Sequence, residues 1–455
     1  MKQRKWTKII VGLDIGTTKV ACIVGRQTEQ GKIEILGYGK TLSTGVRRGV
    51  VTNIIETTEA IKVAVKEAED RAEVNIKRVS VGIAGQHIKS LQHRGLLLRD
   101  NHETEITEVE LENLRNETFK INITPGEEII DVIRQDTYVD GELASNPVGM
   151  LGSKIEANFH VIIGQTAAAK NIIKCVEAAG LDIDYMILEP IGSAQAVLDQ
   201  EEKEAGVVLV DMGGGTTDIA VFKDQKIQHT AVIPFGGNII SEDICKGCSI
   251  MRHYAEEVKV KFGSALVSEN RNDEVVSIPG IKGHAAKEIS FKNLAGIIQA
   301  RLEEIFDLVN CEIQKTKSEN QLIAGIVLTG GGSMMKHIQQ LAEFKTGCEV
   351  RIGYPNEHLA PTEIKEMSSP MYATGIGLII ETIARMEHDR KLEAAKECKM
   401  PVKTDLAVAG ETEAEETPVD KPVLVTKKPR NKGEGFSMKN IVASVTKLFT
   451  ADDIK

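Results

Sequence analysis

Two stretches of the sequence have the same form: an apolar run, an aspartate, a turn rich in glycine and threonine, and a second apolar run. They are GLDIGTTKVACIV, residues 12–24, and LVDMGGGTTDIAVF, residues 209–222. Apolar runs of this length, interrupted by glycine, are typical of buried strands joined by a tight turn. Their recurrence after about 200 residues indicates a duplicated domain and not a short-period solenoid.

The segments around both turns follow the same order of strand, turn, strand and strand. The predicted strands cover residues 9–13, 20–24 and 32–38 in the first half, and 207–210, 219–222 and 227–233 in the second. Residues 91–159 have helical and strand patterns of their own, which indicates a subdomain inserted between the halves. The sequence therefore predicts an α/β protein with two related lobes.

Composition limits the classes of protein that need to be considered. A chain of 455 residues is long enough for two or more domains. Its net charge of −10 gives no general reason to expect a nucleic acid partner. Seven scattered cysteines predict no disulfide framework, and the N-terminus lacks the apolar stretch of a signal peptide, so we expect a cytosolic protein. No stretch approaches the ~20 apolar residues that cross a bilayer, so membrane contact would be peripheral.

The two repeated turns have the composition of phosphate-binding loops. Backbone N–H groups can approach the crowded oxygens of a polyphosphate only where no side chain intervenes, and threonine hydroxyls add donors. An aspartate beside phosphates would be repelled unless Mg²⁺ with its water shell lay between them. One such turn alone is more often a simple hairpin, but the duplication favours phosphate binding. The candidate residues are Asp14, Gly16, Thr17 and Thr18 in the first turn, and Asp211, Gly213, Gly214, Gly215, Thr216 and Thr217 in the second.

A third glycine cluster follows another apolar run, in IVLTGGGSMM at residues 326–335. Gly330, Gly331 and Gly332 would let an adenosine pack against backbone, with Ser333 as the cap of a following helix. Taken singly, an ordinary strand-to-helix turn explains the cluster equally well.

One cysteine pair has the Cys-x-x-Cys spacing of half a zinc site. Cys245 and Cys248 have no second pair and no histidine at finger spacing, so buried structural cysteines are favoured. The sequence predicts no metal other than nucleotide-bound Mg²⁺.

Five motifs together resemble, in order and spacing, those of the actin-like ATPase superfamily. They are DIGTTK, EPIGSAQAVL from Glu189, DMGGGTTD, TGGGS and YATGIGLII from Tyr372. Within that superfamily, the segments from Ile133, Ile233 and His253 resemble the FtsA family of bacterial cell division proteins, and NPVGM at residues 146–150 is the most specific of these markers. The resemblance covers about residues 7–385 and implies a two-lobed actin-like fold of duplicated ribonuclease-H-like domains with an FtsA-type inserted subdomain.

The resemblance also implies a ligand and roles for several residues. ATP would lie between the lobes, with Asp14 and Asp211 holding Mg²⁺ through water and Lys19 approaching the phosphates. Glu256 and Lys259 would frame the ribose and adenine, although without the resemblance they read as an exposed ion pair at i and i+3. Glu189 would polarise the attacking water, although a helix-starting Glu-Pro is also ordinary capping chemistry.

From the same resemblance we expect a particular domain division. The first-lobe core would comprise residues 1–84 and 162–200, the insert 85–161, the second-lobe core 201–240 and 308–390, and its small subdomain 241–307. That small subdomain would receive the C-terminal peptide of FtsZ. Arg301 lies near several carboxylates within it, so an internal salt bridge explains this residue better than a partner contact.

The C-terminal tail changes character twice. Residues 391–434 have few large apolar side chains, several prolines and alternating charge blocks, which predicts a disordered linker. Residues 435–455 form the last predicted segment, a helix and tail. Within it, residues 436–450 place apolar side chains on one helical stripe, which predicts an amphipathic helix lying on a membrane. The predicted membrane-facing residues are Phe436, Met438, Ile441, Val442, Val445, Leu448 and Phe449.

Taken together, these features predict an ATP-binding, actin-like division protein that forms filaments, binds FtsZ and later division proteins, and anchors the Z ring to the cytoplasmic face of the inner membrane. The sequence does not decide whether bound ATP is hydrolysed quickly, slowly or hardly at all. A sugar or acetate kinase of the same fold is the main alternative, but it gives no reason for a lipid-seeking tail. A chaperone ATPase would require a peptide-binding domain for which the tail leaves no room.

Overall fold

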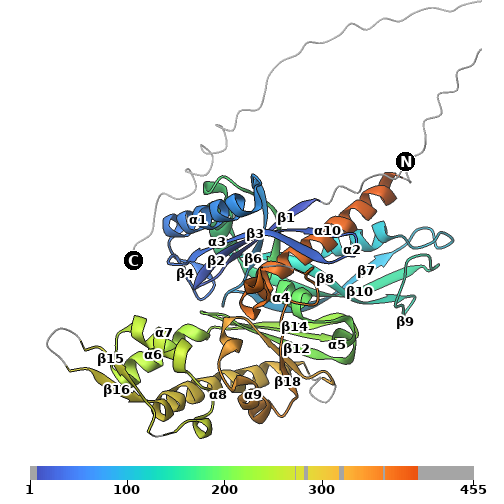
Figure 1. Cartoon of the computed structure of the whole chain (residues 1–455). Helices are drawn as coiled ribbons and strands as arrows, with labels where there is room; N and C mark the ends of the chain where they lie inside the picture. The colour runs from blue at the N-terminus through green and yellow to red at the C-terminus, as the bar shows by residue number, and fades with distance from the viewer. Residues whose placement is uncertain (1–7, 272, 281–284, 317–321, 362–363, 398–455) are drawn as a thin grey trace, which may run out of the picture. The chain divides into compact units, whose positions relative to one another are not determined.

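The computed structural model describes residues 8–271, 273–280, 285–316, 322–361 and 364–397. The predicted amphipathic helix and all of the predicted linker beyond residue 397 lie outside these described residues. Figure 1 shows the described part as two halves, each built on a sheet.

The two central sheets have the same topology. The first has the order β11-β6-β1-β2-β3 and the second β14-β13-β12-β17-β18, so β1 corresponds to β12 and β2 to β13. In each sheet the first strand pairs antiparallel with the second and parallel with a later one. This equivalence confirms the predicted duplication. The strands are β1 (Ile9–Ile15), β2 (Lys19–Gln27), β3 (Ile33–Leu42), β6 (Arg78–Ile83), β11 (Asp182–Leu188), β12 (Val207–Met212), β13 (Thr217–Lys223), β14 (Lys226–Ile233), β17 (Ile326–Thr329) and β18 (Val350–Ile352).

The insert has its own sheet and its own apolar core. Its strands have the order β7-β10-β8-β9, and one helix, α2, packs against them. The core contains Leu111 and Leu114 of α2 and Phe159 of β10, all fully or almost fully buried. The elements are β7 (Lys89–Leu98), α2 (Glu108–Thr118), β8 (Glu127–Val139), β9 (Glu142–Leu143) and β10 (Lys154–Gln165).

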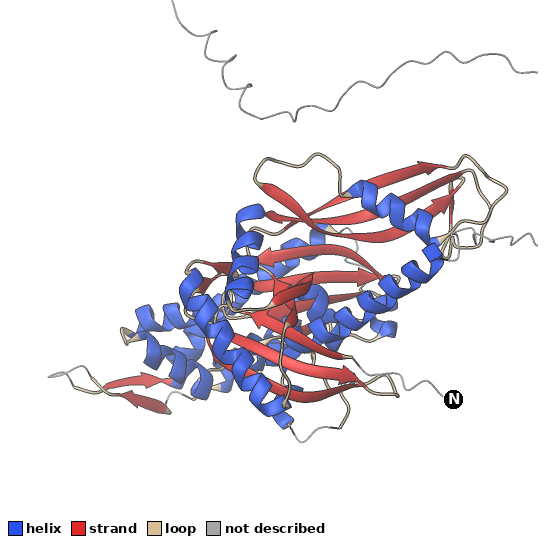
Figure 2. Cartoon of the chain, turned by 90° about the horizontal axis from the view of Figure 1, so that it is seen from above, coloured by secondary structure: helices blue, strands red, loops and turns tan. Residues whose placement is uncertain are grey.

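Helices cover both central sheets, as Figure 2 shows from above. α1 packs against β3 and β2, and α3 contacts both α1 and β11, whereas α10 lies along β1 and crosses α4. α1 begins where Asn53 accepts a hydrogen bond from the backbone N–H of Glu56, the expected cap for a helix start. The main helices are α1 (Ile54–Ala72), α3 (Thr166–Ala178), α4 (Glu189–Val197), α5 (Gln200–Ala205), α6 (Gly237–Cys248), α7 (Arg252–Phe262), α8 (Phe291–Lys315), α9 (Ile338–Thr346) and α10 (Ala373–Glu397).

Strand β12 lies between the two main cores. Its side chains alternate between them: Val207 and Leu209 belong to the core that includes the first lobe, and Val208 and Val210 to the core of the second. A strand buried on both faces has to be apolar at every position, because successive side chains point in opposite directions. This explains the uninterrupted VVLV that precedes Asp211.

The crossing of α4 and α10 depends on two glycines. A Cβ atom at position 377 would overlap the carbonyl oxygen of Gly192, so the two helix backbones touch at this point. On the opposite side of α10, a Cβ atom at Gly12 of β1 would lie 2.5 Å from the carbonyl oxygen of Gly375. Small residues at these positions therefore allow α10 to pack closely against both α4 and the first sheet.

Helix α10 extends further than the sequence indicated. It continues to Glu397 and so includes residues 391–397, which the sequence analysis placed in the linker. The segment KLEAAKE consists of good helix formers, and Leu392 is buried, so the helix gains packing where the composition seemed linker-like. Among the described helices, none combines the length and apolar character that crossing a bilayer requires.

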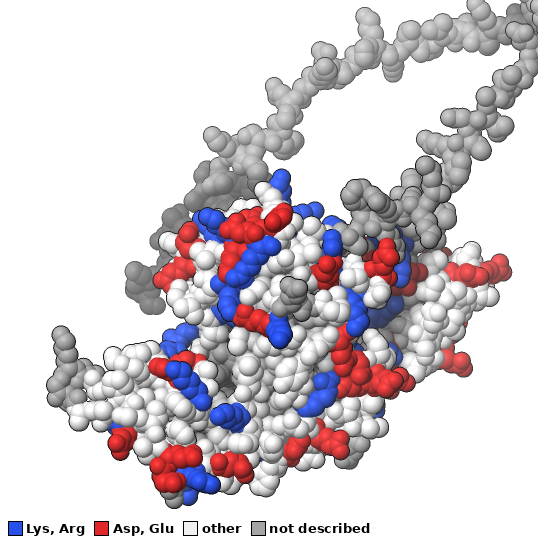
Figure 3. Space-filling view, viewed as in Figure 1, with Lys and Arg blue, Asp and Glu red and all other residues white. Residues whose placement is uncertain are grey.

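Charged side chains lie mainly on the surface, and Figure 3 shows both signs interspersed on one face. An exception is Asp131 on β8, which is 3% exposed. Its carboxylate accepts hydrogen bonds from Arg385 Nη2 at 2.5 Å and Arg115 Nη2 at 3.1 Å. This cluster joins α10 to the insert.

The glycine crossing makes a testable prediction about stability. Gly377→Ala lowers the free energy of unfolding by about 2–3 kcal/mol, because the new methyl group overlaps the Gly192 carbonyl and the helices have to separate. Gly296→Ala on α8 is the matched control, since its Cβ atom would meet only Val267 Cγ2 at 3.8 Å. We expect the control to be more stable than the parent by about 0.5–1 kcal/mol. Denaturant unfolding measures both, and equal effects of the two changes would contradict the crossing.

Candidate functional site

The two glycine-threonine turns meet tip to tip between the lobes. Residues 16–18 join β1 to β2, and residues 213–216 join β12 to β13. A Cβ atom at Gly214 would overlap the Thr18 side chain, and one at Gly215 would lie 2.5 Å from Thr17 Oγ1. Glycine is thus required here by the opposing turn itself, independently of any ligand.

These turns line a cavity of about 390 Å³ between the lobes. It brings together most of the candidate residues from distant parts of the sequence. Those that line it are Asp14, Gly16, Thr17, Thr18, Lys19, Glu189, Asp211, Gly213, Gly214, Gly215, Thr216, Glu256, Lys259, Gly330, Gly331 and Gly332.

Two candidate residues do not line the cavity. Thr217 is fully buried and donates a hydrogen bond to the Phe235 carbonyl at 2.8 Å, because it is the first residue of β13 and points into the lobe. Ser333 was expected to cap a helix, and this prediction is wrong. Its hydroxyl donates to the Gly330 carbonyl within a short 3₁₀ turn, Gly331–Met334, and α9 begins only at Ile338.

The base of the cavity carries four carboxyl groups. Asp211 and Asp218 stand directly opposite each other in the β12–β13 register, and Asp14 and Glu189 line the same cavity. Asp211 accepts hydrogen bonds from Ser193 Oγ at 2.5 Å. It also accepts from Thr374 Oγ1 at 3.2 Å. Ser193 belongs to α4 and Thr374 to α10, so the two crossing helices orient this aspartate.

The crowding of carboxyl groups changes the acidity of Glu189 and Asp218. Burial, followed by the charges of Asp14, Asp218 and Asp211, raises the pKa of Glu189 well above its usual range. Burial, followed by the charge of Asp211, also raises the pKa of Asp218. Asp218 Oδ2 accepts a hydrogen bond from Thr216 Oγ1 at 2.9 Å, whereas its buried Oδ1 has no hydrogen-bond partner within the described residues. The base of the cavity therefore retains protons or needs a compensating positive charge.

Lys19 supplies one such charge. Its Nζ lies 2.9 Å from Asp14 Oδ2 and 5.0 Å from the centre of the Tyr372 ring. The lysine thus occupies the space between the first turn and the start of α10.

Glu256 and Lys259 form an ion pair. The pair is not simply exposed, as the i and i+3 spacing alone suggested. Lys259 is 8% exposed. Its Nζ lies 2.8 Å from Glu256 Oε2 and 2.9 Å from both Ser241 Oγ and the Gly237 carbonyl oxygen. The lysine therefore joins α7 to the first turn of α6, directly beside the cavity.

The sequence analysis missed several residues that line or support the site. Asp218 could have been found, because a four-residue hairpin loop places it opposite Asp211 on the neighbouring strand. Ser193 and Thr374 lie within quoted motifs, but only the packing of α4 and α10 shows that both reach Asp211. Asn238, Met334 and other cavity residues carry no signal of their own in the sequence.

The cysteine pair has a structural environment. Cys248 is buried and Cys245 is half-buried, with its Sγ 2.8 Å from the Ile250 carbonyl oxygen. Across the described ranges, no group of three or more His, Cys, Asp or Glu side chains is arranged to hold a metal ion directly.

Comparison with known proteins identifies the family. A family model described as "Cell division protein FtsA" matches residues 208–377, and one described as "SHS2 domain inserted in FTSA" matches residues 85–163. The chain is 40% identical over 370 residues to the cell division protein FtsA of Neisseria meningitidis serogroup B, covering 81% of this chain and 88% of that protein. It is 34% identical over 380 residues to the cell division protein FtsA of Escherichia coli strain K12, covering 82% and 90%.

Among solved structures, a chain of the PilM-PilN type IV pilus biogenesis complex is similar in fold, with a TM-score of 0.60 at 15% identity, covering 82% of this chain and 98% of that one. The relatives in sequence are division proteins. This favours the predicted division role over a kinase or a chaperone. The chain has an actin-like ATPase fold and belongs to the FtsA family of cell division proteins.

Proposed function

We propose that this chain binds ATP with Mg²⁺ between its lobes, assembles with FtsZ, and anchors the Z ring to the cytoplasmic face of the inner membrane at the division septum. The observation that carries the nucleotide part is the meeting of the two duplicated turns over four carboxyl groups. The domain division given above, the recruitment of later division proteins and head-to-tail filament formation are part of the same proposal, and they rest on the family.

The cavity offers separate surfaces for the two ends of a nucleotide. The turns present backbone N–H groups and the hydroxyls of Thr17, Thr18 and Thr216, which suit phosphate oxygens. At the other end, the Gly330–Gly332 backbone and the Glu256–Lys259 pair would hold the adenosine. Gly330 has a φ of +80°, and a Cβ atom there would overlap Asp211 Oδ1, so glycine is needed at this edge of the cavity.

The carboxyl cluster fits a bound Mg²⁺. Carboxylate oxygens are the ligands this ion prefers, and the buried Oδ1 of Asp218, which has no partner among the described residues, is an acceptor for a metal-bound water. Asp14 and Asp211 would hold the ion through water, as the sequence analysis expected. When bound, Mg²⁺ would neutralise the phosphates and the carboxylates together.

Hydrolysis, where it occurs, would use a carboxylate as the group that orients and deprotonates water. Glu189 and Asp218 both have pKa values raised by burial and neighbouring charge, which brings a carboxyl group toward the range of a general base. Either residue could act in this way, and a slow ATPase is consistent with a cluster that first has to lose a proton.

The ATP assignment predicts a clear effect of Lys19→Met. We expect Mg-ATP affinity in calorimetric titration to fall by about tenfold or more, because one charge-assisted bond to phosphate is lost and Asp14 is left unpaired. Lys62→Met, which removes an exposed lysine from α1, is the control and should bind like the parent. Unchanged affinity in a folded Lys19→Met protein would place the nucleotide elsewhere.

The carboxyl cluster predicts a pH-dependent stability of the nucleotide-free protein. Because the pKa of Asp218 is raised in the folded state, the folded protein binds more protons than the unfolded chain between pH ~4 and the raised pKa. The stability contributed by this group therefore falls as the pH rises through that window.

Asp218→Asn should remove this loss, while its side-chain oxygen still accepts from Thr216. We expect the melting temperature of the variant to exceed that of the parent by roughly 2 °C or more at pH 9, and by much less at pH 5. Asp182→Asn on β11, an exposed position, serves as the control. A difference between parent and Asp218→Asn that does not vary with pH would contradict the coupling.

FtsZ binding would involve the small subdomain of the second lobe. α6, α7, α8 and the β15 (Val275–Ile278)–β16 (Lys287–Ser290) hairpin form this part, and Met251 and Val275 are exposed apolar side chains on it. Arg301 does not need a partner, because its Nε lies 2.6 Å from Asp243 Oδ2, the internal salt bridge that was predicted. We therefore place the peptide against the apolar side chains and not at this arginine.

Membrane anchoring would depend on residues 436–450, outside the described residues. A truncation after Gly435, and separately Ile441→Asp with Leu448→Asp, should abolish co-sedimentation with anionic liposomes, since both remove the apolar stripe. Both proteins should still bind an FtsZ tail peptide like the parent in fluorescence anisotropy. Co-sedimentation of the truncated protein at the parent's level would refute the anchor, whatever the peptide result.

A further inference from the structure

A two-residue hairpin of the first lobe reaches the rim of the nucleotide cavity. It consists of β4 (Val46–Arg47) and β5 (Val50–Val51), with Arg48 and Gly49 at the turn, at φ values of 50° and 73°. Both values are positive, as in a type I′ turn, where asparagine and glycine are the favoured residues. The backbone N–H of Gly49 donates to Thr17 Oγ1 at 3.1 Å. The hairpin is thus attached to the first glycine-threonine turn.

The turn itself does not explain why an arginine, Arg48, has the left-handed backbone conformation. A non-glycine residue there costs about 1–2 kcal/mol, and such strain is typically retained where a side chain has a function. Arg47 and Arg48 are both exposed, and within the described residues neither side chain makes an ion pair or hydrogen bond. The hairpin therefore presents two unpaired guanidinium groups.

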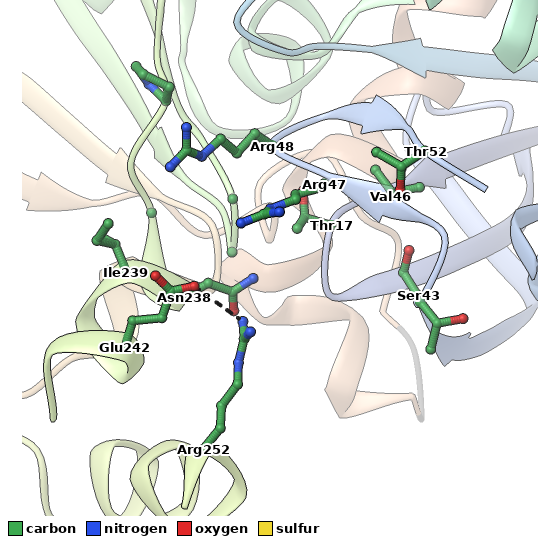
Figure 4. Close-up of a pocket in the computed structure, with 15 residues that line it drawn as sticks. Thr17, Ser43, Val46, Arg47, Arg48, Thr52, Asn238, Ile239, Glu242 and Arg252 are labelled. Atoms are coloured by element: carbon green, nitrogen blue, oxygen red, sulfur yellow. Dashed lines mark ion pairs between the residues drawn. The ribbon is translucent and has the colours of Figure 1, made fainter. Parts of the chain in front are cut away.

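These two side chains line a second cavity, of about 500 Å³, shown in Figure 4. Its wall on the second lobe includes Asn238 and Glu242 of α6 and Arg252 of α7. In Figure 4, Arg47 and Arg48 extend from the hairpin toward that wall, and Arg252 approaches it from below. Three arginines from two lobes thus surround one hollow.

The cavity has an excess of positive charge. Glu242 is the one carboxylate among its described lining residues, and it pairs with Arg252 at a long distance of 3.8 Å between Oε1 and Nη2. The remaining charge on Arg47 and Arg48 is not compensated. A hollow with this charge and several polar walls fits a small anion better than an apolar ligand.

Its position points to one class of anion. The second cavity shares Thr17, Gly214, Gly215 and Asn238 with the first, but none of the residues proposed to hold adenosine. It therefore lies on the phosphate side of the turns. A phosphoryl acceptor such as a sugar would instead call for a free carboxylate to receive a proton, and Glu242, the carboxylate among the described lining residues, is paired with Arg252.

We propose that Arg47, Arg48 and Arg252 form a second anion site that binds orthophosphate, separate from the nucleotide cavity and adjoining it at the turns. The placement of a nucleotide next to this site rests on the proposed function, whereas the anion site itself rests on the three arginines. Orthophosphate could reach it from hydrolysed ATP or from solution.

The test is binding of inorganic phosphate to the full chain saturated with ADP, measured by calorimetry or equilibrium dialysis with labelled phosphate. We expect one phosphate per chain for the parent. Arg47→Thr with Arg48→Asn should weaken phosphate binding at least tenfold, while threonine suits the strand and asparagine suits the left-handed turn. Arg390→Gln with Lys391→Gln, which removes two exposed charges from α10, is the matched control and should bind like the parent.

The two proposals fail differently. If ADP binds but the parent takes up no phosphate, or if the arginine variant binds phosphate like the control, the anion site is refuted. If ADP does not bind to the parent, the proposed nucleotide function fails, and the same titration without ADP decides the anion site through the arginine variant alone.

A second arm identifies the source of the anion. In a single turnover of ATP, quenched samples give the rate of hydrolysis, and a fluorescent phosphate sensor gives the rate of phosphate appearance. A lag that the arginine variant abolishes supports capture of phosphate from the nucleotide. Saturable binding without a lag in the parent supports uptake from solution.

Discussion

The contact between the backbones of α4 and α10 at Gly192 and Gly377 controls the rest of the structure. Each helix belongs to the connection between lobes, and each carries a site residue one to three positions from the glycine. Ser193 and Thr374 can both reach Asp211 only because the helices touch without intervening side chains. One steric condition therefore sets both the packing between lobes and the orientation of a carboxylate in the cavity.

The carboxyl groups at the bottom of the cavity affect the stability of the protein when no ligand is bound. Glu189 and Asp218 are buried beside other carboxyl groups, so the folded state retains protons that the unfolded chain would release. A ligand that brings a cation stabilises the ionised form of these carboxyl groups. The free energy of that interaction then favours binding of the ligand. Under the proposed function, this is the physical reason for binding a nucleotide together with Mg²⁺ and not a nucleotide alone.

The two cavities meet at the same turns but differ in charge. The first is acidic below the turns, with Lys19 as a local cation, and the second is lined by three arginines. The turns thus separate an acidic compartment from a basic one. The backbone N–H of Gly49 in the arginine hairpin donates to Thr17 Oγ1, so the hairpin and the first turn are directly connected.

The sequence by itself determined the features that depend on neighbours along the chain. The β1–β2 and β12–β13 hairpins, their duplicated order and the positions of Asp14 and Asp211 follow from apolar runs interrupted by glycine, which are local signals. The tertiary structure alone decided what those residues meet. Gly214 is fixed by Thr18 from the other lobe, and Lys259 is buried by contacts with α6. Ser333 turns back to Gly330, and three arginines from two lobes surround one hollow. These outcomes depend on distances between segments that are far apart in sequence, and packing of the two lobes sets those distances.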